Sequence, residues 1–294
     1  MKNRIRIPLV LIAVLMFAPK CFPRSSKKPA LQEHVDIGPS SSNAAIPFQL
    51  RSNFLIVVDG QIGPLRSLKF ILDTGATRTI VGAKIANELL LSRHKGKILN
   101  FDKDIKVDWT NVPDLRLGPL VVRNFPAIVG DLKQFSQFAE GIDAIIGMDL
   151  LSTTENILID YRSHFVTMKG SGETLPNPVS TALTVQLLVQ GHLAHLIVDT
   201  GLQDFLLYED RLRWHLPRLK LSGAISQGYA GRLRGKSATL TGIRLGSEES
   251  QSNVLLLALA PTSLPDDIDG YIGTNALHAQ MIELNFAFKV LRWQ

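Results

Sequence analysis

The sequence contains one cysteine and no apolar run long enough to cross a membrane. Cys21 is the only cysteine among 294 residues, which excludes an intramolecular disulfide and a cysteine metal site. The longest apolar run, residues 7–18, has twelve residues and is broken only by Pro8. A membrane-spanning helix needs about 20. Glycine loops for nucleotides and zinc-ligand spacings are also missing from the sequence.

Acidic residues are missing from the first 28 positions, which hold seven basic residues. The rest of the chain has 25 basic against 26 acidic residues, so the formal net charge of +6 comes from this N-terminal segment alone. A neutral body gives no electrostatic reason to bind nucleic acid or a membrane surface. We therefore expect no nucleic-acid partner, and membrane attachment only through the N-terminal segment.

The N-terminal segment has the pattern of an export signal. Lys2, Arg4 and Arg6 precede the apolar run, and twelve apolar residues suit the core of a signal peptide. We predict that residues 1–21 are a signal peptide or a short uncleaved anchor, and that 22–46, rich in Pro, Ser, Lys and Ala, are a flexible linker. The expected location is exported, either periplasmic or extracellular.

The chain after the predicted linker contains many short apolar runs, which predict many short strands. These runs cover residues 54–58, 68–72, 115–117, 120–122, 157–159, 183–189, 193–198 and 254–259. Helical patterns are few, and the candidates are residues 82–91, 148–153, 208–215 and 275–278. The sequence therefore predicts a mostly β protein.

The body also repeats itself. Asp73-Thr74-Gly75 recurs as Asp199-Thr200-Gly201, and the segment 141–151 recurs at 267–277, both at an offset of 126. The two copies run about 47–170 and 178–294, and we call them the first and second lobes. Two copies are too few for a solenoid, so they suggest a duplicated lobe about a pseudo-two-fold axis.

Each copy places an aspartate directly after an apolar strand. A two-fold axis between the copies would bring Asp73 and Asp199 together, and two carboxylates about 3 Å apart share one proton. One carboxylate can then act as base and the other as acid on a water held between them. The glycines that follow, Gly75 and Gly201, allow close backbone approach. The pattern predicts a carboxylate dyad for hydrolysis.

These segments resemble the signatures of the retropepsins, the retroviral-type aspartic proteases. The likeness lies in Asp73-Thr74-Gly75-Ala76 with residues 145–151, and again in Asp199-Thr200-Gly201 with residues 271–277. It implies the acid-protease fold, with two closed β-barrel lobes related by a pseudo-two-fold axis. It also implies peptide-bond hydrolysis without metal or organic cofactor, catalytic roles for Asp73 and Asp199, and bracing roles for Thr74 and Thr200.

Two features differ between the lobes. Ala76 follows the first Asp-Thr-Gly, as in retropepsins, whereas the bulkier Leu202 follows the second. The segment 222–235 has four glycines around Tyr229 and is a candidate flap, while its counterpart at 94–109 is charged and has one glycine. The sequence leaves open which flap closes on substrate.

Other conspicuous residues have simpler interpretations. Asp143 and Asp269, near the end of each repeat, are expected to cap turns or the following helix rather than to catalyse. His192 and His195 lie three apart, on opposite faces of a strand, so we predict no metal site there.

Two functions remain open from the sequence. The first is an exported, single-chain, monomeric aspartic endopeptidase that takes peptide or protein substrates. The second is a weakly active or inactive protease-derived module that binds peptide without cutting it. Pairing of two chains through their first lobes is a further alternative, which the duplication makes unnecessary.

Overall fold

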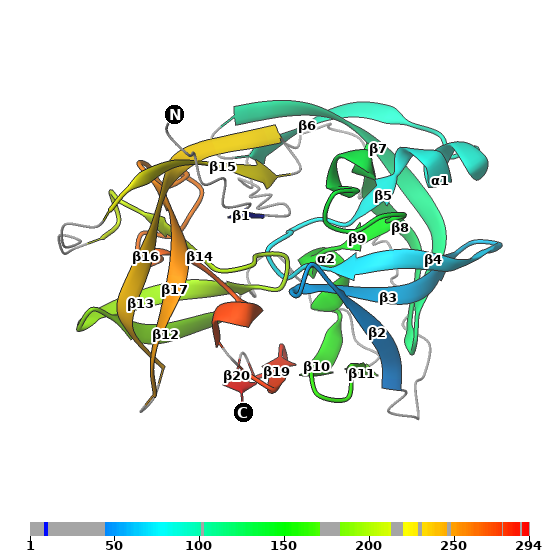
Figure 1. Ribbon diagram of the computed structural model, residues 1–294. Coiled ribbons are helices and arrows are strands. Elements are labelled where there is room, and N and C mark those ends of the chain that lie inside the picture. Colours follow the sequence, from blue (N-terminus) through cyan, green and yellow to red (C-terminus); the bar gives the residue numbers. More distant parts are fainter. Residues whose placement is uncertain are drawn as a thin grey trace.

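The protein is almost entirely built of strands. A computed structural model describes residues 9–10, 45–100, 103–170, 183–212, 220–228, 231–245, 248–277, 279–288 and 290–293. Most regular structure in these residues is β-strand, which confirms the prediction of a mostly β protein. The strands form two large sheets, which lie on either side of the molecule (Figure 1).

The larger sheet contains the first lobe. Its order is β20-β19-β10-β11-β2-β3-β4-β9-β5-β8-β7-β6. The strands have these bounds: β2 Ala45–Arg51, β3 Leu55–Ile62, β4 Leu65–Leu72, β5 Ile80–Gly82, β6 His94–Asn100, β7 Lys103–Leu117, β8 Leu120–Gly130, β9 Ala144–Ile146, β10 Thr154–Asp160, β11 Phe165–Gly170, β19 Met281–Asn285 and β20 Val290–Trp293.

The smaller sheet contains most of the second lobe. Its order is β1-β15-β16-β12-β13-β18-β14-β17. The strands have these bounds: β1 Leu9–Val10, β12 Thr184–Val189, β13 His192–Asp199, β14 Phe205–Tyr208, β15 Ser222–Gly228, β16 Gly231–Leu245, β17 Glu248–Leu257 and β18 Gly270–Gly273.

The same strand pairings occur in both lobes. The strand before each Asp-Thr-Gly pairs in parallel with an apolar strand that ends each repeat, β4 with β9 and β13 with β18. The short strand after each loop pairs in parallel with a long hairpin strand, β5 with β8 and β14 with β17. The two catalytic-loop candidates therefore occupy equivalent places in the two sheets.

Two aspartates fasten these parallel pairs in the same way. The carboxylate of Asp143 accepts the backbone N–H of Lys69 at 3.0 Å, and its own N–H donates to the Lys69 carbonyl at 2.9 Å. Asp269 makes the same two bonds with His195, at 2.9 and 2.8 Å. Their observed role is thus to hold backbone between neighbouring strands, 70 residues after each Asp-Thr-Gly aspartate.

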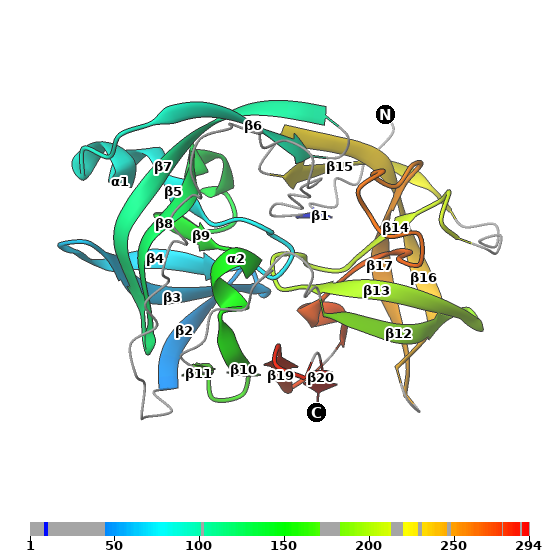
Figure 2. The same ribbon diagram turned by 180° about the vertical axis from the view of Figure 1, so that it is seen from behind.

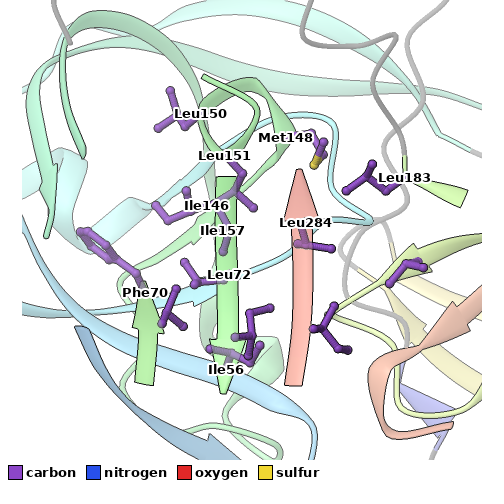
Figure 3. Packing of buried hydrophobic residues seen from close by; sticks show 14 of the residues in the cluster. Ile56, Phe70, Leu72, Ile146, Met148, Leu150, Leu151, Ile157, Leu183 and Leu284 are labelled. Carbon is purple, nitrogen blue, oxygen red and sulfur yellow. The ribbon is translucent and has the colours of Figure 1, made fainter. Parts of the chain in front are cut away.

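The chain's last two strands leave the second lobe and join the first sheet. β19 pairs with β10 over five residues, with Ile157 opposite Leu284 and Ile159 opposite Ile282. All four side chains are buried, and Figure 3 shows Leu284 beside Ile157 within the larger core. Burying an aliphatic side chain of this size contributes about 1.5–3 kcal/mol. The lobes are therefore joined by a continuous sheet and core, because the last two described strands of the chain, β19 and β20, lie in the first sheet.

Other boundaries also differ from the sequence-based expectation. β2 begins at Ala45, inside the predicted linker, and pairs with β11 and β3. The predicted helix at 208–215 is wrong at its start, because Tyr208 ends a fully buried strand and turns follow it to residue 211. A strand that pairs on both edges and is buried on both faces lacks the alternation that separates strand from helix in a sequence.

Helices are short in the residues described. α1 spans Ala83–Glu88 and α2 spans Met148–Leu151, and 3₁₀ turns occupy Leu132–Phe135 and Thr274–Leu277. The two α-helices lie within segments predicted to be helical, and the second 3₁₀ turn overlaps the predicted segment 275–278. None of the described helices is long and apolar enough to cross a membrane.

Several predictions concern residues outside the described part of the chain. Tyr229, the candidate flap residue, is one of them. The signal or anchor segment and the linker up to residue 44 are others, except for Leu9 and Val10, whose backbone forms β1.

Candidate active site

The two aspartates end equivalent strands and come together between the lobes. Asp73 follows β4, and its N–H donates to the Ile146 carbonyl of β9 at 3.0 Å. Asp199 is the last residue of β13 and lies opposite Gly273 of β18. Both carboxyl groups are fully buried. The parallel pairing in each lobe therefore places one aspartate in the middle of the molecule. Figures 1 and 2 show that the loop after β4 and the loop after β13 meet there.

The glycines of the two motifs make the close approach possible. A Cβ atom on Gly75 would lie 2.3 Å from the Cγ atom of Asp199, and one on Gly201 would lie 2.7 Å from the Cγ atom of Asp73. Real Cβ atoms do not approach other atoms so closely. Any side chain at either glycine would push the opposite carboxyl away. The glycines thus set the distance between the lobes at this point.

The threonines bind across the lobe boundary. The Thr74 hydroxyl donates to the Val198 carbonyl at 2.8 Å, and the Thr200 hydroxyl donates to the Leu72 carbonyl at 2.7 Å. Each hydroxyl also accepts the backbone N–H of the other threonine at 3.0 Å. These four reciprocal bonds fix the two loops relative to each other, and they are all buried or partly buried. Hydrogen bonds shielded from water lose less to competition with solvent.

Each aspartate is held by backbone groups of its own loop. The Oδ1 atom of Asp73 accepts the N–H groups of Gly75 and Ala76 at 2.9 and 3.0 Å. The Oδ1 atom of Asp199 accepts the N–H of Gly201 at 2.7 Å. The carboxyl groups are thereby oriented by the turn itself, with one oxygen committed to the loop and the other left for chemistry.

Burial controls the charge of the pair. It raises the pKa of Asp73 well above its usual value, and the neighbouring Asp199 carboxyl raises that pKa further. Burial likewise raises the pKa of Asp199, to about 7, although the N–H of Gly201 opposes the shift. Two buried carboxylates in contact cannot both be charged at low cost. The arrangement can hold a single proton between two acids.

Leu202 does not change the backbone turn. Its N–H donates to the Asp199 carbonyl at 3.2 Å, and the N–H of Ala76 donates to the Asp73 carbonyl at 3.3 Å. The Leu202 side chain is fully buried in an apolar cluster with Leu206 and Tyr271. The extra bulk is thus accommodated in the core of the second lobe.

Sequence reasoning did not single out Asp149, which supports the first loop. Its two carboxylate oxygens accept the N–H and the hydroxyl of Thr79, at 2.9 and 2.8 Å. The Thr79 hydroxyl also accepts the N–H of Gly147 at 3.2 Å. Burial raises the pKa of Asp149, and the bonds from Thr79 oppose that shift. The sequence offered one signal for Asp149: the second copy of the repeat has Asn275 at this position, so the acid occurs in the first lobe alone. In the structure Asn275 is exposed.

Among the described residues, no group of three or more His, Cys, Asp or Glu side chains is placed to hold a metal ion. His195 instead contacts the Thr184 hydroxyl at 2.9 Å and the Asp267 carbonyl at 3.1 Å.

Comparison with known proteins gives a family for the first lobe. Residues 58–153 match the family described as gag-polyprotein putative aspartyl protease. A search of curated proteins found no match. Among solved structures, a retropepsin-like aspartic protease from Rickettsia conorii is similar, with 18% sequence identity and a TM-score of 0.32, over 43% of this chain and 89% of that one. Residues 58–153, the segment that contains Asp73-Thr74-Gly75 and Asp149, are therefore similar to the retropepsin-like aspartyl proteases.

Proposed function

We propose that the protein is an aspartic endopeptidase that hydrolyses peptide bonds with water activated between Asp73 and Asp199. The observation that carries this proposal is the pair of buried aspartates, linked across the lobes by four reciprocal threonine bonds. Such rigidity is what a preorganised catalytic site requires. The match of residues 58–153 to an aspartyl protease family supports the reaction class.

The proposed reaction uses the shared proton. The ionised carboxylate takes a proton from water, and the water oxygen bonds to the peptide carbonyl carbon. The protonated carboxyl gives its proton to the carbonyl oxygen. The newly protonated carboxyl gives its proton to the nitrogen as the C–N bond of the tetrahedral intermediate breaks, and the other carboxylate takes a proton from one of the intermediate's hydroxyls, giving a carboxyl and an amine. Both aspartates return to the single-proton state.

One chain supplies both halves of this site. The duplication proposed from the sequence places the two motifs 126 residues apart, and the equivalent strand pairings in the two lobes support it. We therefore propose a monomeric enzyme that binds peptide or protein substrates and needs no cofactor for this mechanism.

The test is cleavage of a denatured protein by purified wild type, Asp73→Asn and Asp199→Asn between pH 3 and 8. We expect wild-type cleavage, and a loss of at least about 1,000-fold in each variant, because the mechanism needs both acids. Denatured protein that binds but stays intact would favour the non-cleaving peptide-binding module. Near-normal turnover in Asp199→Asn alone would favour pairing of first lobes from two chains.

We also propose that the N-terminal segment directs export. The support is its basic start and twelve-residue apolar run. Fractionation of cells that produce the full chain or a variant lacking residues 2–21 tests this. Recovery of the full chain in the same compartment as the truncated variant would contradict it.

A further inference from the structure

The backbone surroundings of the two aspartates are matched. Burial raises the pKa of both carboxyls, and in each case two backbone N–H groups lower it again. These groups belong to Gly75 and Ala76 for Asp73, and to Gly201 and Gly75 for Asp199. The threonine hydroxyls are also used symmetrically, because each donates to a carbonyl of the other lobe. The backbone and the threonines therefore give the negative charge of the singly protonated pair no reason to lie on one particular aspartate.

The neighbouring side chains, in contrast, differ between the lobes. In the first lobe the residue two positions before Asp73 lies opposite Ile145 of β9. In the second lobe the residue two positions before Asp199 lies opposite Tyr271 of β18. Side chains two apart in a strand share a face of the sheet, and so do residues that lie opposite each other in neighbouring strands. Tyr271 thus lies on the same face as Asp199, at the place where the first lobe has an aliphatic residue.

Tyr271 is the side chain of β18 nearest to Asp199 in the strand pairing. Directly opposite Asp199 is Gly273, which has no side chain. Tyr271 is the diagonal neighbour on the same face, and such neighbours lie within reach of an aromatic side chain. Tyr271 is 2% exposed and Asp199 is 0% exposed. The phenol and the carboxyl therefore lie close together and away from bulk solvent, where electrostatic interactions are stronger than in water.

The Tyr271 ring is held in place by its neighbours. It packs in an apolar cluster with Leu202 and Leu206. Its ring also meets that of Tyr208 edge to face, with the ring centroids 6.3 Å apart. Because the ring is fixed by this packing, the hydroxyl oxygen keeps its place relative to β13, and only its hydrogen is free to rotate.

The first lobe has no phenol in the corresponding place. The equivalent cluster, which contains Ile145, includes no tyrosine among its described members. Trp109 packs against that cluster, but it belongs to β7 and lies over Gly96 of β6. The charged groups of the surrounding loops and strands have other partners: Asp269 with His195, Asp149 with Thr79 and Arg78, and Asp204 with Ser252.

The phenol stays neutral and is in electrostatic contact with the dyad. Burial raises the pKa of Tyr271 well above its usual value, and the neighbouring Tyr208 and Asp199 raise it further. The hydroxyl therefore keeps its hydrogen while the pair loses its first proton. A hydroxyl turns its hydrogen toward a nearby negative charge, and the resulting stabilisation is larger in a buried site than in water. The aliphatic side chain of Ile145 offers Asp73 no such group.

We propose that Tyr271 is a positioning residue that places the negative charge of the singly protonated pair on Asp199, so that the proton resides on Asp73. Asp199 is then the carboxylate that takes a proton from water, and Asp73 is the acid that protonates the peptide carbonyl. The catalytic meaning of this inference rests on the proposed function, whereas the charge distribution belongs to the free protein. Two motifs of identical sequence thus become chemically different through a residue outside both.

The first test follows the two carboxyl groups by ¹³C NMR in full-length protein with labelled aspartate, without substrate. Loss of a signal in Asp73→Asn or in Asp199→Asn assigns it. At a pH midway between the two titration steps of the wild-type pair, we expect the Asp199 carbon to report mainly the charged form and the Asp73 carbon mainly the protonated form. Equal sharing, or charge mainly on Asp73, would overturn the proposal.

The same titration in Tyr271→Phe removes the hydroxyl and keeps the ring. The first step, which creates the charge on Asp199, should move to higher pH by about 0.5 unit or more, and the Asp199 share of the charge should fall. The second step should move less, because Asp199 is charged both before and after it. Tyr208→Phe, which removes the other phenol of the cluster, is the matched control and should leave both steps within about 0.2 unit. An unmoved first step in Tyr271→Phe, or equal shifts in the two variants, would contradict the role of Tyr271.

Cleavage kinetics give a second readout. Tyr271→Phe should move the acidic limb of the kcat profile to higher pH and leave the alkaline limb nearly in place, so that kcat falls by about 3-fold or more on the acidic side while KM stays within about 2-fold. A rise in KM with an unmoved profile would indicate a packing role and count against the inference. Absence of cleavage by wild type would count against the endopeptidase instead, because the NMR titration measures the charge distribution without turnover.

Discussion

At the scale of single residues, the site depends on what surrounds two ordinary aspartates. Gly75 and Gly201 let the carboxyl groups meet, and burial then disfavours their charge. Neither residue that follows the motifs, Ala76 or Leu202, can donate a side-chain hydrogen bond to its aspartate. The pair should therefore keep its proton to higher pH than a dyad with a serine or threonine neighbour.

The first residue-scale prediction concerns the pH profile of cleavage. Wild type should show a bell-shaped profile, whose limbs belong to the pair rather than to either aspartate. Ala76→Ser should shift the bell to lower pH, because a hydroxyl donor favours the charged carboxylate and lowers its pKa. Ala86→Ser, at a buried position of α1, is the control that should keep the wild-type profile. An unmoved profile in Ala76→Ser would refute this account of tuning.

The second residue-scale prediction concerns stability. An aspartate whose pKa is raised on folding binds its proton more tightly in the folded protein than in the unfolded chain. Its contribution to the free energy of unfolding therefore falls as the pH rises from about 4 toward the folded pKa, which is about 7 for Asp199. Asp199→Asn removes this penalty. Urea unfolding should show the variant to be more stable than wild type at pH 7.5, by about 1–3 kcal/mol, with the gain lost at pH 4. An equal gain at both pH values would show another cause.

At the scale of elements, parallel strand pairs position each loop, and a carboxylate reinforces only the first. Thr79, just before β5, is joined to Asp149 of α2 by two hydrogen bonds. In the second lobe the residue in the place of Thr79 is Phe205, which is buried in the main core. The two lobes thus fix the same strand by different means, a polar link in one and apolar packing in the other.

Alanine substitution at the two equivalent positions tests this difference. Asp149→Ala leaves the N–H and hydroxyl of Thr79 without their buried acceptors, and should lower the free energy of unfolding by about 2–4 kcal/mol. Asn275→Ala, at the exposed equivalent position, should change it by less than about 0.5 kcal/mol. Urea denaturation of both variants measures the contrast. Similar effects in the two variants would contradict a special role for Asp149.

At the scale of the whole molecule, the two lobes share one core and one sheet. The pairing of β19 with β10 and the reciprocal threonine bonds both connect residues more than 120 positions apart. Separation of the lobes would break both. The proposed activity should therefore depend on the intact chain and not on its concentration.

Dilution tests this expectation. Activity per chain should stay constant from about 10 μM to 10 nM, because a single chain contributes both aspartates. A site assembled from two chains would lose activity as the dimer dissociates. A parallel measurement of mass in solution at the same concentrations gives the control. Loss of specific activity together with loss of mass would favour the homodimer.

The sequence by itself determined the β-rich class, the two Asp-Thr-Gly loops and the repeat of their surroundings. These features are local, because alternation, apolar runs and short motifs each depend on residues that are neighbours in the sequence. It also predicted turn-capping roles for Asp143 and Asp269, although not their reciprocal bonds across strands.

The tertiary structure decided what joins distant parts of the chain. The entry of β19 and β20 into the first sheet and the link from Asp149 to Thr79 depend on strand register and packing. A buried strand such as Phe205–Tyr208 carries no alternation to distinguish it from a helix. The strand register gives the residue-by-residue alignment of the hairpins β6–β7 and β15–β16, where the repeat of 126 becomes an offset of 128.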